Sequence, residues 1–562
     1  MTQIIVVTVI LLFIIFGAGY YREQNEKKAY KESLLKDYGK VNNRKFTSDE
    51  LKSIRGYELY HRDENDFLID DTTWNDLDMN LIYARMNYCK SSSGDEYLYN
   101  MLRHPQTLGH DWTDFEKKVE GLKLDENLRS ELALCLHDIG RSGNLSIYSY
   151  LDKLDEAKGI SFGANMAGVI AYIPAIAICF LNLPVGIALV FILAVYNIAF
   201  YFKQKRKIEP YIICFEYIFK VLKNCDSLIV TLKNDRSSIL DEEMEVLNET
   251  TEAFASFRRF SSLVVGDLGT GPLAVILDYV KMLTHTDLLK FDSMLAQVKQ
   301  HKGEIDQILR ITGQIDAYMS IGEYRTYLND HCIPELDDGY KGLEIEEGYH
   351  PLISEPVTNS IDAKRSILLT GSNASGKSTF LKMIAINALL SQSIHTVCAK
   401  RYKAPYYEIY SSLNLKDNIL SGESYYMVEI RSIKRIIDAC DRGSKVLGFV
   451  DEVLRGTNTV ERIAASSAIL RNLNSKGVLV FAATHDLELT AILENEYDNY
   501  HFDEVIDVND VRFTYKLSEG KATSRNAIRL LITMGYDNDI TDKAIDMAKA
   551  LEKDFDINRL KE

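Results

Sequence analysis

Several features are scarce or missing in this chain of 562 residues, and each absence excludes a class of protein. The eight cysteines are scattered without a C-x-x-C pair, so neither a disulfide framework nor a zinc site is indicated. No Ser/His/Asp or Cys/His constellation indicates nucleophilic catalysis. The chain has no low-complexity linker and no obvious repeat, which leaves a protein of several ordinary domains.

One glycine-rich motif is present in full. Residues 370–379 read Thr-Gly-Ser-Asn-Ala-Ser-Gly-Lys-Ser-Thr, which matches G-x-x-x-x-G-K-[ST]. The β-like stretch 365–369 precedes it and the helical spacing of 380–385 follows it, as a phosphate loop requires. Backbone N–H groups would cradle the phosphates, Lys377 would reach the β/γ oxygens, and Ser378 would offer a hydroxyl to Mg²⁺. The candidate nucleotide-binding residues are Gly371, Ser372, Asn373, Ala374, Ser375, Gly376, Lys377, Ser378 and Thr379.

Two carboxylates end a second apolar stretch. Residues 446–452 read Val-Leu-Gly-Phe-Val-Asp-Glu, the Walker B pattern. Asp451 is the predicted Mg²⁺ residue, and Glu452 is predicted to position or polarise the attacking water. A third apolar stretch, 477–483, leads to His485, which we predict to steady the transferring phosphoryl group, although an isolated histidine here would be an ordinary surface residue. These residues predict binding and hydrolysis of ATP with Mg²⁺.

Four further segments belong to this region of the chain, namely His350-Pro351-Leu352-Ile353, Ser421-Gly422-x-Ser424 with Met427-Val428-Glu429, Asp451-Glu452-Val453-Leu454-Arg455-Gly456-Thr457-Asn458-Thr459, and Phe481-Ala482-Ala483-Thr484-His485 with Glu488-Leu489-Thr490. Together they resemble the corresponding segments of MutS-family ATPases over about residues 345–530, and Asn373 is also typical of that family. The phosphate loop departs from the family at Ser372 and Ala374-Ser375. Val357-Thr358 also stands where an aromatic residue that stacks on adenine is common.

The resemblance implies an ABC-type composite site in a homodimer, where a serine of one chain contacts the γ-phosphate bound to the other. Ser421 and Ser424 are the candidates for this contact. Their alternative role is to cap the start of the following helix. Residues 523–552 resemble the family's C-terminal helical dimerisation segment, with its last helix opening near Ile540.

A second strong signal is a long stretch without charge. Residues 159–202 contain no charged side chain, and a single span needs about 20 apolar residues, so two spans with a turn at 182–184 are predicted. The alternative, a buried hairpin of a soluble core, is disfavoured by the length and uniform apolarity of the run. The apolar stretch 4–20 is predicted to be a third span. Its alternative is a cleaved signal peptide, with a weak cleavage site at 17–19, but export would remove an ATPase from ATP.

Acidic residues outnumber basic ones, and the net charge is −16. DNA-binding proteins usually carry a basic footprint, although a net negative charge does not exclude a local patch. The cluster formed by Lys203, Lys205, Arg206 and Lys207 is one such patch. Because it directly follows the apolar run, we interpret it as the cytoplasmic flank of a membrane segment that also favours anionic lipid.

The remaining sequence is helical in pattern, with Leu, Ile, Glu and Lys at helical spacing in 66–150 and 205–330. Segments 70–77 and 94–105 resemble the start of the MutS core and lever region, and 313–317 resembles its end. This resemblance implies that the membrane hairpin is inserted where the family extends its levers toward a DNA clamp. The family's mismatch-reading Phe-x-Glu occurs only as Phe502-Asp503-Glu504, inside the ATPase region, so we expect no mismatch-recognition domain.

The expected fold is an α/β ABC/MutS-type P-loop ATPase domain with an all-α core and lever region that includes transmembrane helices. The expected boundaries are an anchor at 1–21, a cytosolic helical segment at 22–158, a transmembrane hairpin at 159–202, a second helical segment at 203–340, and the ATPase domain with its dimerisation segment at 341–562.

The expected function is that of a membrane-anchored MutS-like ATPase whose composite dimer site drives lever motion. It would bind DNA in the manner of the family but without mismatch specificity. The expected partners are a second copy, membrane lipid and an unidentified protein client. The expected location is the cell membrane, with several spans and a cytoplasmic ATPase domain. The alternatives are an ATPase acting on a membrane or protein client without DNA, and an ABC-type transport ATPase, for which three spans are few.

Overall fold

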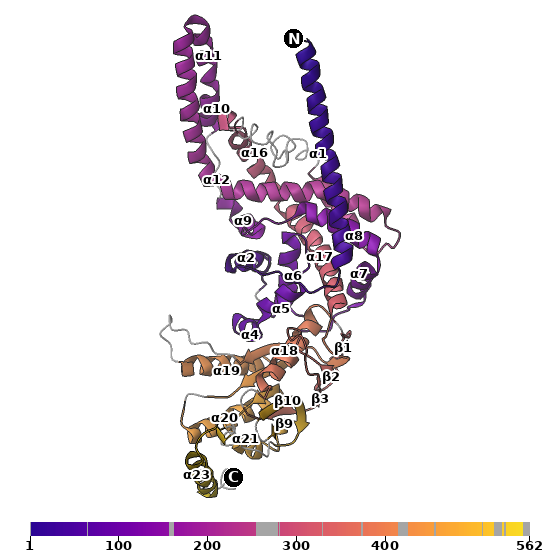
Figure 1. The fold of residues 1–562 in the computed structure, drawn as a ribbon, viewed down its shortest axis with the longest axis vertical. Coiled ribbons are helices and arrows are strands. Elements are labelled where there is room, and N and C mark those ends of the chain that lie inside the picture. The colour runs from indigo at the N-terminus through magenta and orange to yellow at the C-terminus, as the bar shows by residue number, and fades with distance from the viewer. Residues whose placement is uncertain are drawn as a thin grey trace. The chain divides into compact units, whose positions relative to one another are not determined.

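The structure is a computed structural model, and its contacts divide the chain into two compact units (Figure 1). It describes residues 2–63, 66–156, 162–254, 279, 282–328, 330–372, 375–413, 425–454, 457–507, 510–521, 531–532 and 535–554. Unit 1 comprises Met1–Arg62, Asn87–Asn100 and Thr113–Tyr324. Unit 2 comprises Asp63–Met86, Met101–Trp112 and Arg325–Glu562. Each unit is therefore assembled from segments that are distant in sequence, and the boundaries predicted from the sequence stay predictions.

The regular structure in the described residues of unit 1 consists of helices alone, as the sequence pattern predicts. Its helices are α1 (Thr2–Asp37), α2 (Ser48–Ile54), α3 (Gly56–Tyr60), most of α6 (Ser92–Arg103), α7 (Thr113–Leu124), α8 (Glu126–Ile139), α9 (Ile147–Asp152), the 3₁₀ helix η1 (Lys153–Glu156), α10 (Phe162–Ile170), α11 (Tyr172–Leu181), α12 (Leu183–Asn234), α13 (Asp241–Glu252), α16 (Thr286–Gln300) and most of α17 (Lys302–Tyr327). The buried carboxylate of Asp316 on α17 accepts hydrogen bonds from the N–H groups of Lys90 and Ser91, just before α6 begins.

The uncharged run forms a helical hairpin, with α11 and the first part of α12 lying side by side (Figure 1). The turn lies at Asn182, which caps α12 by accepting a hydrogen bond from the N–H of Val185, so the predicted turn is confirmed. The two helices approach closely at Gly186, where a Cβ would lie 2.4 Å from the backbone nitrogen of Cys179. Glycine is required here because any side chain would push the helices apart.

The hairpin exposes large apolar side chains that an ordinary soluble surface would not gather in one place. These are Ile173, Ile176, Phe180, Leu181, Leu183, Val185, Ile187, Phe191, Ile192, Val195, Tyr196 and Phe202. Among the described residues, one helix is long and apolar enough to cross a membrane, the 52-residue α12, whose most apolar window has mean hydropathy 2.3 and is 11% buried. The predicted set of three spans is therefore reduced to one helix of spanning length, beside the shorter apolar segment Asn165–Leu181. The side chains of the predicted N-terminal span lie largely outside the described residues.

Unit 2 has the mixed α/β architecture that the motifs predict. Its elements are α4 (Asp71–Asp76), α5 (Met79–Met86), β1 (Glu335–Leu336), β2 (Leu343–Gly348), β3 (Asn359–Ala363), β4 (Ser366–Thr370), α18 (Lys377–Ser393), β5 (Arg401–Ala404), β6 (Glu408–Ser412), α19 (Tyr425–Asp441), β7 (Val446–Asp451), α20 (Thr459–Ser475), β8 (Leu479–Ala483), α21 (Leu487–Ile492), β9 (Tyr497–Asp507), β10 (Asp510–Glu519) and α23 (Asn538–Asp554). A six-stranded sheet has the order β10-β9-β4-β8-β7-β6, and a four-stranded sheet has the order β1-β5-β2-β3.

The central strands of the six-stranded sheet are parallel and buried along their whole length. Strands β4, β8 and β7 read Ser-Ile-Leu-Leu-Thr, Leu-Val-Phe-Ala-Ala and Val-Leu-Gly-Phe-Val-Asp, and every residue in them is buried. Continuous apolar runs of this kind are typical of parallel strands that are covered on both faces. The three strands predicted from the apolar stretches are therefore confirmed, and only β10 runs antiparallel at the sheet edge.

A segment from the N-terminal half is built into unit 2. The buried carboxylate of Asp76, at the end of α4, accepts hydrogen bonds from Ser411 Oγ at 2.8 Å and from the N–H of Leu413 at 2.9 Å. The ring of Phe67 packs edge-on against Tyr410 with ring centroids 5.6 Å apart. These contacts attach residues 63–86 to the end of β6, just before the segment that carries the predicted trans serines.

The substitution Asp76→Ala tests this attachment. It leaves two buried donors at the end of β6 without their acceptor, which we expect to lower the stability of unit 2 by about 2–4 kcal/mol. The measurement is urea unfolding of the full chain followed by a probe in unit 2. Asn75→Ala, at an exposed position of the same helix, is the matched control. Equal unfolding of the two variants would contradict the structural role assigned to Asp76.

Candidate nucleotide-binding site

The three motifs that the sequence places far apart meet at one edge of the six-stranded sheet. Strand β8 pairs in parallel with β4 on one side and with β7 on the other. The phosphate loop follows β4, the Walker B acids end β7, and His485 follows β8. Parallel strands present their carboxyl ends at the same edge, which is where ligands bind in open α/β sheets.

The phosphate loop turns at glycines whose backbone other residues rarely adopt. Gly371 has φ 147° and Gly376 has φ 108°, both in the region that favours glycine. Gly376 directly precedes α18, so its position lets N–H groups at the start of that helix point into the loop. Ser375 is buried, and its hydroxyl has no hydrogen-bond partner among the described residues. A phosphate oxygen is an acceptor that suits this orphaned hydroxyl.

Lys377 lies folded back onto the loop. Its ammonium donates to the carbonyl oxygens of Gly371 and Ser372, each at 2.8 Å, and lies 3.4 Å from His485 Nε2. The same histidine nitrogen is 2.7 Å from Glu452 Oε1. Lys377, predicted to bind phosphate, and His485 and Glu452, predicted to be catalytic, therefore form one continuous chain of polar contacts.

Ser378 and Asp451 provide a pair of oxygen ligands suited to Mg²⁺. The Ser378 hydroxyl donates to the Asp451 carboxylate, which is nearly buried at the end of β7. Mg²⁺ prefers hard oxygen ligands, few of them from protein, with the remainder supplied by phosphate and water. A hydroxyl and a carboxylate in contact beside a phosphate loop fit that preference, so these two residues would hold the ion and let it neutralise phosphate charge.

The loop after β7 is held in an uncommon conformation. Glu452 has φ 55° and Leu454 has φ 62°, although neither is glycine. Residues in this region cost about 1–3 kcal/mol each and persist only when their surroundings fix them. Glu452 also lines a cavity of about 170 Å³, together with Val453, Arg462, Thr484, His485 and Asp486. The candidate catalytic carboxylate therefore faces an open space beside the phosphate loop.

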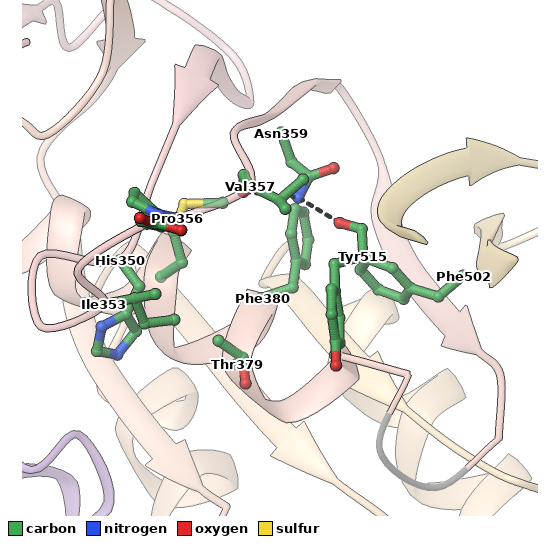
Figure 2. A pocket seen from close by; sticks show the side chains of 12 residues that line it. His350, Ile353, Pro356, Val357, Asn359, Thr379, Phe380, Phe502 and Tyr515 are labelled. Carbon is green, nitrogen blue, oxygen red and sulfur yellow. Dashed lines mark hydrogen bonds between the residues drawn. The ribbon is translucent and has the colours of Figure 1, made fainter. Parts of the chain in front are cut away.

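A larger cavity of about 240 Å³ borders the phosphate loop at Gly376 and is lined mainly by apolar side chains (Figure 2). In Figure 2 the ring of Tyr515 stands beside those of Phe502 and Phe380, and His350 and Ile353 lie across the view from Tyr515. Asn359 Nδ2 donates to the Tyr515 carbonyl at 3.0 Å, which ties β3 to β10 at the pocket rim. Gly376 and Thr379 also line the pocket, so it opens directly onto the phosphate loop.

The sequence alone did not identify this pocket. In the sequence, His350 belongs to the family-like segment 350–353 and Phe502 to a Phe-x-Glu, and no motif marks Tyr515. His350 lies more than 150 positions before Phe502 and Tyr515, and no local spacing joins it to them. The one usable signal in the sequence is Val357, which stands where the family commonly has an adenine-stacking aromatic, because in the structure another aromatic residue, Tyr515, lines the same pocket.

Four predicted site residues lie outside the described residues, namely Asn373, Ala374, Ser421 and Ser424. The others, Gly371, Ser372, Ser375, Gly376, Lys377, Ser378, Thr379, Asp451, Glu452 and His485, surround the edge of the sheet as described above. Thr379 lies one residue beyond Ser378 in the first turn of α18 and faces the larger pocket.

This fold and these motifs define a P-loop ATPase-type domain. Residues 367–552 match the family described as MutS domain V. That match covers the phosphate loop, the Walker B segment and His485.

Curated relatives agree with this match. A DNA mismatch repair protein MutS from Natronomonas pharaonis is 29% identical over 266 residues, covering 45% of this chain and 30% of that protein. MutS proteins from Persephonella marina and Thermotoga maritima are 30% and 28% identical, covering 49% and 48% of this chain. The chain spans about a third of the length of these relatives. The comparisons therefore support the MutS family for about half of the chain.

The pocket histidine gives a pH prediction. Burial, reinforced by the nearby Lys382, lowers the pKa of His350 to about 4. Its Nδ1 accepts from the N–H of Leu352 at 3.3 Å, which requires the neutral ring. In the unfolded chain the imidazole of His350 is protonated below about pH 6.5, whereas in the folded chain it stays neutral down to about pH 4. The free energy of unfolding therefore falls as the pH falls from about 6.5 to about 4, by at most about 3 kcal/mol.

The measurement is the thermal unfolding midpoint at pH 7 and at pH 4.5 for the wild type and for His350→Asn, which keeps an acceptor but does not titrate. We expect the variant to lose less stability on acidification than the wild type. An identical pH dependence of the two proteins would show that His350 is not held neutral by the fold.

Proposed function

We propose that the chain is a Mg²⁺-dependent ATP hydrolase of the MutS type. The observation that carries the proposal is the polar chain from Lys377 through His485 to Glu452, placed beside the Ser378–Asp451 pair. Lys377 would leave the loop carbonyls and bind phosphate oxygens, and Glu452 would orient and polarise the attacking water. His485 holds the Glu452 carboxylate and stabilises charge on the transferring group.

The 240 Å³ pocket is the proposed site of the nucleobase. It adjoins the phosphate loop, its walls are apolar, and Tyr515 offers an aromatic face that an adenine ring can stack on. Val357, which also lines the pocket, supplies apolar contact rather than a second ring. Adenine recognition would then depend mainly on the strand pair that carries Phe502 and Tyr515.

Hydrolysis is proposed to require a homodimer. In this arrangement Ser421 and Ser424 of one chain contact the γ-phosphate bound to the other, and the C-terminal helical segment at 523–552 holds the two chains together. Closure on ATP and release after hydrolysis would then move the helical lever region. DNA is the ligand proposed for that region, because the relatives are named DNA mismatch repair proteins.

We also propose that the α11–α12 hairpin lies in the cell membrane, with the ATPase domain in the cytoplasm. The exposed apolar side chains of the hairpin favour lipid over water, and the basic cluster at 203–207 follows it on α12, where anionic headgroups would meet it. A protein client in or at the membrane is the alternative partner of this hairpin.

The substitution Glu452→Gln tests the proposed reaction. It should lower kcat by about 100- to 1,000-fold while ATP still binds, because the amide cannot act as the base. Phosphate release and binding of a fluorescent ATP analogue are measured on the full chain in detergent. Glu461→Gln, an exposed carboxylate on α20, should behave as the wild type, and Lys377→Ala should lose affinity. Normal turnover in Glu452→Gln would contradict the role proposed for Glu452 in polarising the attacking water.

A paired substitution in the hairpin tests the membrane proposal. Ile176→Asp together with Phe191→Asp places two charges among exposed apolar side chains, and each charge costs about 2.5–3.5 kcal/mol in a bilayer. We expect alkaline carbonate to release a larger fraction of the paired variant from membranes than of the wild type. Leu124→Asp, which changes an apolar side chain 78% exposed on α7, is the control. Unchanged extraction of the paired variant would argue against a lipid environment.

A further inference from the structure

Residues 452–454, which follow β7 and are called the Walker B loop below, make hydrogen bonds to three different elements. The N–H of Glu452 donates to the carbonyl of Ala483 on β8 at 2.9 Å. Ser466 Oγ on α20 donates to the carbonyl of Val453 at 3.1 Å. The N–H of Leu454 donates to the carboxylate of a residue on α19, Glu429. These three bonds hold a segment in which two residues adopt left-handed backbone conformations.

The bond from Leu454 is the most unusual of the three, because its acceptor is a buried carboxylate. Glu429 is 2% exposed. Leu454 is itself only 4% exposed, so without this acceptor its N–H would be buried and unsatisfied, which costs about 1–3 kcal/mol. A leucine in the left-handed region needs such external support, because its own side chain opposes that conformation.

The helix that carries Glu429 begins at Tyr425, directly after the segment that contains Ser421 and Ser424. Its buried positions include Ile433, Ile436 and Ala439, which belong to the core behind β7. The inward face that packs this helix onto the sheet therefore also delivers the Glu429 carboxylate to the Walker B loop. A shift of α19 along its axis would move the acceptor of the Leu454 N–H.

We propose that Glu429 is a positioning residue for ATP hydrolysis. It fixes the Leu454 amide, and through two intervening peptide units it sets the direction in which the Glu452 side chain leaves the backbone. It thereby couples the position of α19 to the candidate catalytic carboxylate. The inference rests on the proposed ATPase function and adds to it a residue that touches neither nucleotide nor metal.

This arrangement separates turnover from nucleotide affinity. Lys377 is held by loop carbonyls and Ser378 by Asp451, which lies within strand β7 and is paired with β8. None of these contacts passes through Leu454 or Glu429. Loss of the Glu429 acceptor should therefore leave ATP binding in place and impair the step that needs Glu452 in position.

The test compares two substitutions at the same site. Glu429→Met fills a similar volume but removes the acceptor, whereas Glu429→Gln keeps an amide oxygen for the Leu454 N–H. We expect Glu429→Met to lower kcat by about 10- to 100-fold, with affinity for a non-hydrolysable ATP analogue within about twofold of wild type. Glu429→Gln should retain kcat within about threefold. Asp438→Ala, at an exposed position of the same helix, is the matched control.

Each outcome decides the proposal. Wild-type kcat in Glu429→Met would overturn it, as would equal losses of kcat and ATP affinity. A tenfold or larger loss in Glu429→Gln would also overturn it, because the charge rather than the acceptor would then matter. If Glu429→Met fails to fold, the kcat of Glu429→Gln alone decides. A wild-type protein without Mg²⁺-dependent ATPase activity would instead contradict the proposed function itself.

Discussion

The parallel pairing of β8 between β4 and β7 is the constraint on which the candidate site depends. It brings together the ends of three chain segments that lie up to 115 residues apart, from Thr370 to His485. The pairing is stabilised by strands buried along their whole length, so the polar residues at their ends are held on a rigid apolar base. A shift of one residue in either register would separate Lys377, Glu452 and His485.

Backbone conformation is the second layer of this arrangement. Glycine supplies the left-handed positions of the phosphate loop, where backbone groups must face a phosphate. After β7 the same region is occupied by Glu452 and Leu454, whose conformation depends on hydrogen bonds from neighbouring elements. Strain kept by surrounding contacts is common where a side chain must point in one functional direction. In the phosphate loop, glycine adopts the left-handed conformation without strain. In the loop after β7, hydrogen bonds from neighbouring elements hold Glu452 and Leu454 in that conformation.

The sequence predicted the parts of the site that are local in the chain. The phosphate loop and Walker B acids have fixed spacings, and the apolar runs of β4, β7 and β8 identify buried strands. It did not predict the pocket around Tyr515 and His350, or the attachment of Asp76 to β6, because these join segments that only tertiary folding brings together. The sequence pattern also gave no sign that the apolar run and the basic cluster share one helix, α12, which continues to Asn234 because Lys and Arg are good helix formers.

The most direct test of the central claim is a single-turnover measurement of phosphate release from ATP by the full chain in detergent, with Mg²⁺ or with EDTA. Duplex DNA is present or absent at two salt concentrations. We predict phosphate release with Mg²⁺ and none with EDTA. If the lever region binds DNA, duplex DNA should raise the rate, and this stimulation should weaken as the salt concentration rises. A rate indifferent to DNA would leave a motor with a membrane or protein client. No Mg²⁺-dependent release under any of these conditions would contradict the account.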